Sequence, residues 1–324
     1  MTSQTDDLPI EIHAPDISRW RAGNTGVDYV HRFDSGQPGP TVHVQALTHG
    51  NEICGAIALG ALLEEMAEGG FRPTHGRLSL AFGNVAAFER WDPAKPFESR
   101  YVDEDFNRVW ADAAMHDGDT GERRRARELQ PFVDAADLLL DIHSMNEPCA
   151  PLMVCGTLEK HARFAAELGT PADLLLDTGH PAGLRMVERG GFGDPASPKR
   201  ALLVECGQHW EAGAEAVAHD TLARFLGLAG VAAPSWVASH TRLPLPSAQR
   251  LVRVTEPVVA KSTAFRFTVP VVAMSVIPQA GTPIAEDGGH VWTTPYDDCV
   301  LVMPSQRRFK PGQTMVRLGQ YVAL

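Results

Sequence analysis

The chain has 324 residues, of which 44% are hydrophobic and 21% are charged. This length and composition are typical of a globular protein with one large domain and a smaller one. The net charge of −11 argues against a nucleic-acid-binding protein, because contacts with phosphates need a basic surface.

Signals of cellular location point to the cytoplasm. The opening MTSQTDDLPIEIHAPDI contains neither a basic nor an apolar leader segment, and no stretch approaches the roughly 20 apolar residues of a membrane span. The five cysteines are widely spaced and form no C-x-x-C motif, which favours reduced thiols over a disulfide framework. We therefore expect a cytoplasmic protein that binds neither nucleic acid nor membranes, while assembly into homo-oligomers stays open.

Apolar strands alternate with helical patterns over the first two thirds of the chain. Residues 41–48 (TVHVQALT) predict a buried strand, and the apolar spacing from Ile53 to Met66 predicts a helix that ends at the following Gly-Gly pair. GRLSLAFGN, DAADLLLDIHS and KRALLVECG predict further strands, and GERRRARELQPFVDAA predicts a helix whose run Arg123–Arg125 forms a solvated face. This alternation indicates an α/β sheet protein.

The composition changes near residue 234. The segment APSWVASHTRLPLPSAQR is rich in Pro and Ser, and beyond it short β-like runs separated by Pro and Gly replace the helical patterns. We therefore expect a catalytic domain over residues 1–235 and a smaller all-β domain over residues 236–324.

Four polar clusters lie directly after the strand-like runs or in adjoining loops: HGNE, SRYVDEDFNR, DIHS and VECGQ. Ligands in open α/β sheets gather beyond the carboxyl ends of the strands, so we expect these clusters to meet. Spacing alone does not select HGNE, because four histidines have an acidic residue three positions later. These pairs are His13/Asp16, His31/Asp34, His49/Glu52 and His116/Asp119.

The clusters contain the parts of a zinc site. A catalytic zinc ion typically binds three protein ligands and one water, and it lowers the pKa of that water to about 7. His49, Glu52 and His143 would supply the three ligands, two from one loop and the third from a neighbouring strand. Asp141 lies two residues before His143 on the same strand face and would orient its imidazole. We therefore expect one Zn²⁺ per chain.

Hydrolysis also needs a proton acceptor and charge-stabilising groups. A carboxylate on the apolar strand ALLVEC needs a reason, because an unpaired buried charge costs several kcal/mol. We expect Glu205 to accept the proton of the water and to pass it to the leaving amine. Arg100, held by Asp105, would stabilise the oxyanion. Asn107 and Arg108 would bind a carboxylate of the substrate.

Each of these residues also has an ordinary structural alternative. His49 and Glu52 are compatible with loop and helix-terminus roles, His143 with a strand-end role, and the arginines with salt bridges. Glu205 is equally compatible with a buried ion pair. The conjunction of four such clusters favours an enzyme.

These motifs together resemble those of the succinylglutamate desuccinylase/aspartoacylase family, which is related to the zinc carboxypeptidases. HGNE, RYVDEDFNR, DIHS and VEC occur in the family's order and at its approximate separations, over about residues 41–210. The resemblance implies a zinc-carboxypeptidase-like mixed sheet flanked by helices, with a β domain that helps to roof the site. It implies the same roles for His49, Glu52, His143, Glu205, Arg100, Asn107 and Arg108.

The chain departs from the aspartoacylase pattern at two places. Aspartoacylases carry a further substrate arginine about ten residues before the catalytic glutamate, where this chain has GDPASPKR. Arg185, Arg189 and Arg200 are candidate replacements. A tyrosine of the aspartoacylase tail has no clear counterpart here, and Arg307 and Arg308 occupy its general region. The identity of the acyl group therefore stays open.

The sequence thus predicts a zinc-dependent hydrolase that cleaves the amide bond of a small, anionic N-acyl amino acid. Two alternatives remain: a zinc carboxypeptidase that acts on peptides, and a non-catalytic zinc-binding protein. A serine hydrolase is disfavoured, because the chain has no G-x-S-x-G motif.

Overall fold

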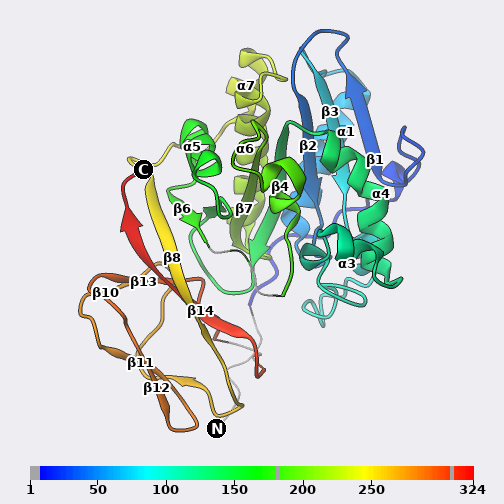
Figure 1. The fold of residues 1–324 in the computed structure, drawn as a ribbon. Helices are drawn as coiled ribbons and strands as arrows, with labels where there is room; N and C mark the ends of the chain where they lie inside the picture. The colour runs from blue at the N-terminus through cyan, green and yellow to red at the C-terminus, as the bar shows by residue number, and fades with distance from the viewer. Residues whose placement is uncertain (1–7, 178, 180–181, 307–309) are drawn as a thin grey trace.

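A computed structural model describes residues 8–324 except 178, 180–181 and 307–309. The described residues form an 11-stranded mixed sheet in the order β1-β3-β2-β4-β7-β5-β6-β8-β14-β13-β10, which is shown in Figure 1. Its strands are β1 (Val30–Asp34), β2 (Thr41–Ala46), β3 (Arg77–Phe82), β4 (Leu138–Met145), β5 (Leu152–Val154), β6 (Asp173–Leu176), β7 (Arg200–Gln208), β8 (Arg250–Val259), β10 (Val276–Ile277), β13 (Cys299–Val302) and β14 (Thr314–Val322).

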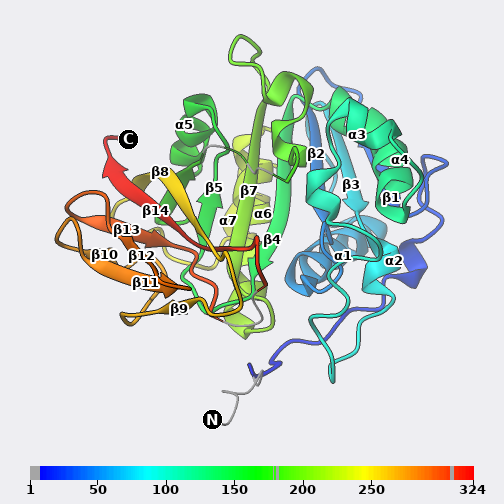
Figure 2. The ribbon, with the colours of Figure 1, turned by 60° about the horizontal axis from the view of Figure 1, so that its bottom comes forward.

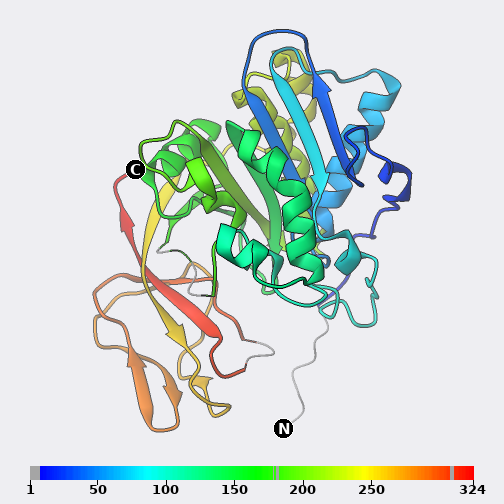
Figure 3. The same ribbon diagram turned by 45° about the vertical axis from the view of Figure 1, so that its right-hand side comes forward.

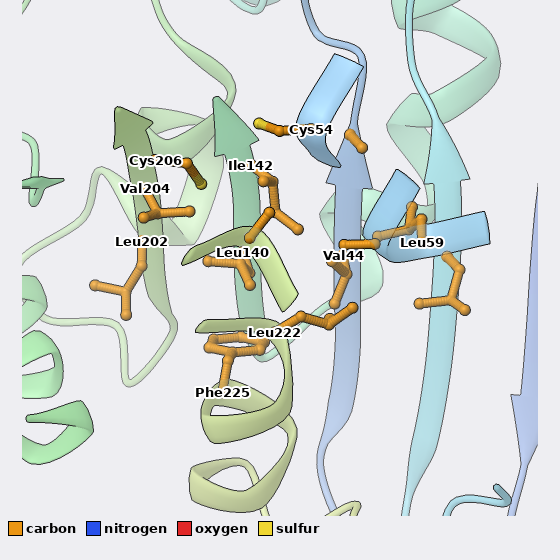
Figure 4. Close-up of a cluster of buried hydrophobic side chains, with 14 of the residues drawn as sticks. Val44, Cys54, Leu59, Leu140, Ile142, Leu202, Val204, Cys206, Leu222 and Phe225 are labelled. Carbon is orange, nitrogen blue, oxygen red and sulfur yellow. The ribbon is translucent and has the colours of Figure 1, made fainter. Parts of the chain in front are cut away.

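Helices cover both faces of the parallel part of the sheet. On β4, Leu140 and Ile142 belong to one apolar core with residues of α1 (Ile53–Glu68), α5 (Glu159–Leu168) and α6 (Ala212–Leu228). Leu139 belongs to a second core with residues of α4 (Gly121–Ala135). Figure 4 shows Leu222 and Phe225 of α6 packed against the face of the sheet that carries Leu140 and Ile142. Because both faces are buried, the central strands are continuous apolar runs. The helices are α1 (Ile53–Glu68), α2 (Val85–Phe88), α3 (Asp112–His116), α4 (Gly121–Ala135), α5 (Glu159–Leu168), α6 (Ala212–Leu228) and α7 (Pro234–His240).

The structure confirms the predicted mixed sheet with flanking helices. The four predicted strands correspond to β2, β3, β4 and β7, and the two predicted helices to α1 and α4. Strands β1, β5 and β6 and helices α2, α3, α5, α6 and α7 were not predicted from the sequence. Strands β5 and β6 span only three and four residues, too few for a period of two to stand out.

The run Arg123–Arg125 in α4 differs from its predicted solvated face. The side chain of Arg124 is half exposed, but that of Arg125 is largely buried. Arg125 donates hydrogen bonds of 2.9 Å to the carbonyl oxygens of Gly83 and Phe82. The prediction is therefore wrong for Arg125, because its guanidinium satisfies backbone acceptors at the end of β3.

The C-terminal strands extend the main sheet. Strand β8 pairs in parallel with β6, with Arg250 opposite Asp173, and pairs antiparallel with β14. Figures 2 and 3 show these strands, coloured yellow to red, at one side of the molecule. A second sheet, in the order β12-β11-β9, joins the C-terminal strands in a core of their own. It consists of β9 (Arg266–Phe267), β11 (Pro283–Asp287) and β12 (His290–Thr293).

The small antiparallel sheet region agrees with the β-rich C-terminal part predicted from the sequence. The division of the chain after residue 235 stays a prediction. Helix α7 (Pro234–His240) lies across that boundary.

Gly50, between His49 and Asn51 of the HGNE segment, is enclosed by backbone. A Cβ atom at Gly50 would lie 2.4 Å from the nitrogen of Phe88 and 2.5 Å from the carbonyl oxygen of Ser99. We expect Gly50→Ala to lower the free energy of unfolding of the metal-free protein by about 2 kcal/mol or more, since backbone on both sides leaves no room to repack.

Urea denaturation monitored by circular dichroism measures this effect. Gly60→Ala in α1 is the matched control, because a Cβ atom there has nothing within 4 Å. It should stabilise the protein by about 0.5–1 kcal/mol through helix propensity. Equal effects of the two substitutions would contradict this account.

Candidate functional site

The candidate site lies where three parallel strands end. HGNE follows β2, His143 is near the end of β4 and Glu205 is near the end of β7. Strands β2 and β4 are neighbours in the sheet, and so are β4 and β7, where His143 is in register with Glu205. The parallel order of these strands therefore brings together residues that are far apart in the sequence.

His49, Glu52 and His143 form a buried cluster of three potential metal ligands. One carboxylate oxygen of Glu52 is 2.7 Å from Nδ1 of His49, and the other is 2.8 Å from Nδ1 of His143. One ligand atom from each residue lies within 4.8 Å of the others. The structure thus brings together the three residues selected from the sequence, and two imidazoles with one carboxylate are a donor set that suits zinc.

The charges of this cluster are strongly coupled. Burial opposes ionisation of Glu52, yet the two neighbouring imidazoles hold its pKa well below the ordinary value. Burial also opposes protonation of His143, but the carboxylates of Asp141 and Glu52 raise its pKa well above the ordinary value. The three groups therefore favour positive charge between them, which either protons or a metal cation would supply.

Asp141 contacts His143 as its position on β4 predicts. One oxygen of Asp141 lies 2.7 Å from Nε2 of His143. The other oxygen accepts a hydrogen bond of 2.7 Å from Thr48, whose hydroxyl in turn accepts one from Gln45. This buried chain fixes the imidazole so that Nδ1 points at Glu52.

Arg100 and Asp105 lie beside the cluster. Arg100 donates hydrogen bonds of 3.3 Å to both Glu52 and Asp105, so the predicted Arg100–Asp105 contact is present. Asp105 also lies 3.0 Å from Nε2 of His49, a contact that the sequence did not suggest. Burial raises the pKa of Asp105, but His49 and Arg100 outweigh burial and keep this carboxyl ionised.

Glu205 is a buried carboxyl whose side chain makes no hydrogen bond or ion pair with any described residue. It is 9% exposed, and its Oε2 atom is buried without a hydrogen-bond partner. Burial raises the pKa of Glu205 to about 8, although the nearby His143 acts against this shift. Such a carboxyl can exchange a proton near neutral pH.

The backbone turns sharply after Glu205. Gly207 has φ = +127°, and a Cβ atom there would lie 2.2 Å from a carboxylate oxygen of Glu211. That carboxylate instead accepts a hydrogen bond of 2.8 Å from the backbone nitrogen of Gln208. The glycine therefore allows β7 to end immediately beyond the candidate proton acceptor.

Asn107 and Arg108 follow Asp105 in a short 3₁₀ turn (Phe106–Arg108). The side-chain oxygen of Asn107 accepts a hydrogen bond of 3.0 Å from the backbone nitrogen of Met186. Arg108 donates one of 2.7 Å to the carbonyl of Asn107 and lies 3.9 Å from Asp105. Most donors of Arg108 are therefore left for a ligand.

Eight of the predicted residues line one cavity of about 840 Å³: His49, Glu52, Arg100, Asp105, Asn107, Arg108, His143 and Glu205. Residues from the parallel part of the main sheet and residues from the C-terminal strands both line it, in keeping with the roof that the family resemblance implies. Residues from the C-terminal part include Val254, Val259, Met303, Thr314 and Arg317. The volume suits a small molecule.

The three arginines considered as replacements for the additional family arginine are all engaged elsewhere. Arg185 makes hydrogen bonds of 2.7 and 2.6 Å with the two oxygens of Asp177. Arg189 pairs with Asp134 at 2.6 Å, and Arg200 lies 3.8 Å from Glu167 at the surface. Only Arg185 lines the cavity among these three. Arg307 and Arg308 lie outside the described residues.

Sequence reasoning missed several residues of the cavity wall, and Arg317 is one of them. It lies on β14, more than 100 residues after VECGQ. Its flanking residues MVRLG fit any amphipathic strand, so the sequence contains no local signal for this role.

The fold and the site together define a mixed α/β protein with a candidate metal centre of two histidines and one carboxylate that lines a cavity. The model of the succinylglutamate desuccinylase/aspartoacylase catalytic domain matches residues 38–225, more than half of the chain. The chain therefore belongs to the succinylglutamate desuccinylase/aspartoacylase family, as the motifs indicate.

Several solved structures share the fold. The succinylglutamate desuccinylase of Vibrio parahaemolyticus is 16% identical with a TM-score of 0.64, and the match covers 89% of this chain and 83% of that one. The Vibrio cholerae enzyme is 15% identical with a TM-score of 0.66, covering 91% and 86%. The product-bound ectoine utilization protein EutE (DoeB) of Ruegeria pomeroyi is 18% identical with a TM-score of 0.62, covering 95% and 92%. A search of curated protein sequences returned no match.

Among the described residues, no helix combines the length and the apolar character that crossing a membrane requires.

We expect His143→Ala to abolish tight metal binding, because two ligands from one loop are too few for a stable zinc site. Elemental analysis after zinc loading and gel filtration measures the metal content. His31→Ala is the matched control, since His31 belongs to another His-x-x-acid pair but lies on the edge strand β1. A full metal complement in the His143 variant would refute the ligand assignment.

Proposed function

We propose that this protein is a zinc-dependent hydrolase of small, anionic N-acyl amino acids, with His49, Glu52 and His143 as the metal ligands. The observation that supports it most directly is the position of Glu205. This buried, unpaired carboxyl shares a cavity with the three-ligand cluster. Membership of the desuccinylase/aspartoacylase family supports amide hydrolysis as the reaction class.

The donor set fits a hydrolytic zinc site, because it supplies three protein ligands of the preferred types. A bound zinc ion would polarise the scissile carbonyl and lower the pKa of the attacking water. Asp141 would keep the His143 imidazole oriented through its contact of 2.7 Å.

Glu205 accepts the proton of the attacking water and transfers it to the nitrogen of the leaving amine. The C–N bond then breaks, and the products are a carboxylate and a free amine. A pKa of about 8, caused mainly by burial, lets the same carboxyl accept and release this proton near neutral pH.

Arg100 stabilises the negative charge that develops on the scissile carbonyl oxygen. Its contacts of 3.3 Å with Glu52 and Asp105 hold the guanidinium at the edge of the ligand cluster. Asn107 and Arg108 bind the substrate carboxylate, because the planar guanidinium fork matches the two carboxylate oxygens.

The same proposal places the protein in the cytoplasm. All five cysteines are unpaired and four of them are buried, as reduced thiols in a reducing compartment would be.

A substrate screen tests the proposal against the two alternatives from the sequence. Zinc-loaded protein is assayed on N-acetyl and N-succinyl amino acids and on a panel of short peptides, with amine release as the readout. We expect turnover of N-acyl amino acids and little turnover of peptides, because the cavity is small and partly roofed by the C-terminal strands.

The chelator arm of the screen separates a catalytic metal from a structural one. We expect a chelator to abolish turnover while circular dichroism shows a folded protein. Faster turnover of peptides would instead support a carboxypeptidase, and unfolding by the chelator without any prior activity would support a zinc-binding protein.

We expect Glu205→Gln to retain zinc and to lose about 10²-fold or more in kcat, because the amide cannot accept the proton of the water. Steady-state kinetics and elemental analysis measure the two effects. Glu64→Gln, at a surface carboxylate paired with Arg19, is the control and should leave both unchanged. Near-normal turnover of the Glu205 variant would remove this residue from the mechanism.

A further inference from the structure

Gln45 is a fully buried polar residue on an inner strand of the main sheet. It lies on β2 between the apolar residues Val44 and Ala46, and none of these three side chains is exposed. In the pairing of β2 with β4, Gln45 is in register with Asp141, the carboxylate that contacts His143. A buried amide is costly unless hydrogen bonds satisfy it, so its presence at this position needs an explanation.

The amide of Gln45 is satisfied at one end. Its nitrogen donates a hydrogen bond of 2.7 Å to the hydroxyl oxygen of Thr48. Its oxygen has no hydrogen-bond partner among the described residues, and neither has Nε2 of His43, two positions earlier on the same strand. Because an unpaired buried carbonyl lowers stability, an apolar side chain of the same length would suit the fold at least as well. Stability alone therefore does not explain Gln45.

The hydrogen bonds between Gln45 and Asp141 have a defined direction. The hydroxyl of Thr48 has a single proton, which it donates at 2.7 Å to one oxygen of Asp141. Thr48 therefore accepts from Gln45, and this fixes which end of the amide faces it. The other oxygen of Asp141 lies 2.7 Å from Nε2 of His143. Two donors thus converge on one carboxylate, and Gln45 strengthens the first of them by polarising the hydroxyl.

We propose that Gln45 is a positioning residue for the imidazole of His143 and that it acts through Thr48 and Asp141. It holds the hydroxyl of Thr48 in the rotation that donates to Asp141. Asp141 in turn holds the ring so that Nδ1 faces Glu52 at 2.8 Å. Gln45 does not itself line the cavity. The inference rests on the proposed function in one respect, because His143 is there a metal ligand.

A competing role for Gln45 is purely structural. Burial lowers the pKa of His43 to about 4, and the side chain of Gln45 opposes this shift, so the two groups interact. If Gln45 serves to hold His43 within the strand, its loss should destabilise the fold and leave His143 unaffected. A positioning role predicts the reverse, a change at His143 without a loss of stability.

The variant Gln45→Met separates the two roles, because it keeps the length of the side chain and removes the donor. In metal-free protein labelled with ¹⁵N-histidine, NMR detects the Nε2 proton of His143, which is assigned by its absence from His143→Ala. We expect Gln45→Met to shift this resonance and to speed its exchange with solvent, since the contact with Asp141 opens more often. The free energy of unfolding, from urea denaturation, should stay unchanged or rise.

Zinc affinity, measured by competition with a chromophoric chelator, is the second readout. Partners of a ligand imidazole typically change metal affinity by about 10- to 100-fold. We expect a loss in this range for Thr48→Val and a loss of about 10-fold for Gln45→Met. The double variant should bind zinc no more weakly than Thr48→Val alone, because Gln45 acts through Thr48. Additive losses would overturn the proposed route.

Val44→Ala is the matched control on the same strand. Val44 belongs to the apolar core on the opposite face of the sheet, as Figure 4 shows. Its truncation should lower stability through lost packing and leave both the His143 resonance and the zinc affinity unchanged. An unchanged resonance in Gln45→Met, or a change no larger than that in Val44→Ala, would refute the positioning role.

The two readouts distinguish a failure of this inference from a failure of the proposed function. If the wild type binds no zinc or hydrolyses no N-acyl amino acid, the proposed function fails. The assignment of Gln45 then still stands when the His143 resonance of the metal-free protein changes in Gln45→Met and not in Val44→Ala. If the wild type is an active zinc enzyme and Gln45→Met matches it in both resonance and affinity, the proposed function stands and the assignment of Gln45 is wrong.

Discussion

The carboxylate of Glu52 lies between two imidazoles, and the rest of the site depends on this arrangement. Its two oxygens are 2.7 Å from Nδ1 of His49 and 2.8 Å from Nδ1 of His143. Groups this close and this deeply buried are stable only with positive charge among them. The loop after β2 meets the end of β4 because these strands are parallel neighbours in register. The order of the strands in the sheet therefore determines that His49, Glu52 and His143 lie together.

Two arginines of the cavity wall differ from Glu205 in how their charge is balanced. Arg100 and Arg185 are each held by two carboxylates of the chain, as buried charges in folded proteins normally are. The carboxyl of Glu205, which lines the same cavity, has no such partner among the described residues. In the proposed function this carboxyl contacts the reacting water. Its missing partner is thus supplied by the water rather than by the fold.

The sequence predicts the central strands β2, β3, β4 and β7 and the cluster of three candidate ligands well, because their signals are local. The apolar runs around His143 and Glu205 mark buried strands, and a carboxylate within such a run is conspicuous. The 9% exposure of Glu205 agrees with that interpretation. The role of Arg125 as a donor to backbone carbonyls and the contact of Asp105 with His49 depend on packing between distant segments. The place of Arg317 in the cavity wall depends on the pairing of β8 with β6, which leaves no trace in the residues around position 317.

The pairing of β8 with β6 restricts how the cavity can open to admit a substrate or release a product. Residues 250–253 of β8 pair with the parallel strand β6, so the C-terminal strands and the parallel strands belong to one continuous sheet. A hinge rotation of the C-terminal strands would have to break the hydrogen bonds between β8 and β6. Substrate entry and product release therefore depend on motions of side chains and short loops at the rim of the cavity. Such motions are typically faster than domain rotations. The residues at the rim of the cavity, rather than a rotation of one domain against the other, would then set the rate of product release.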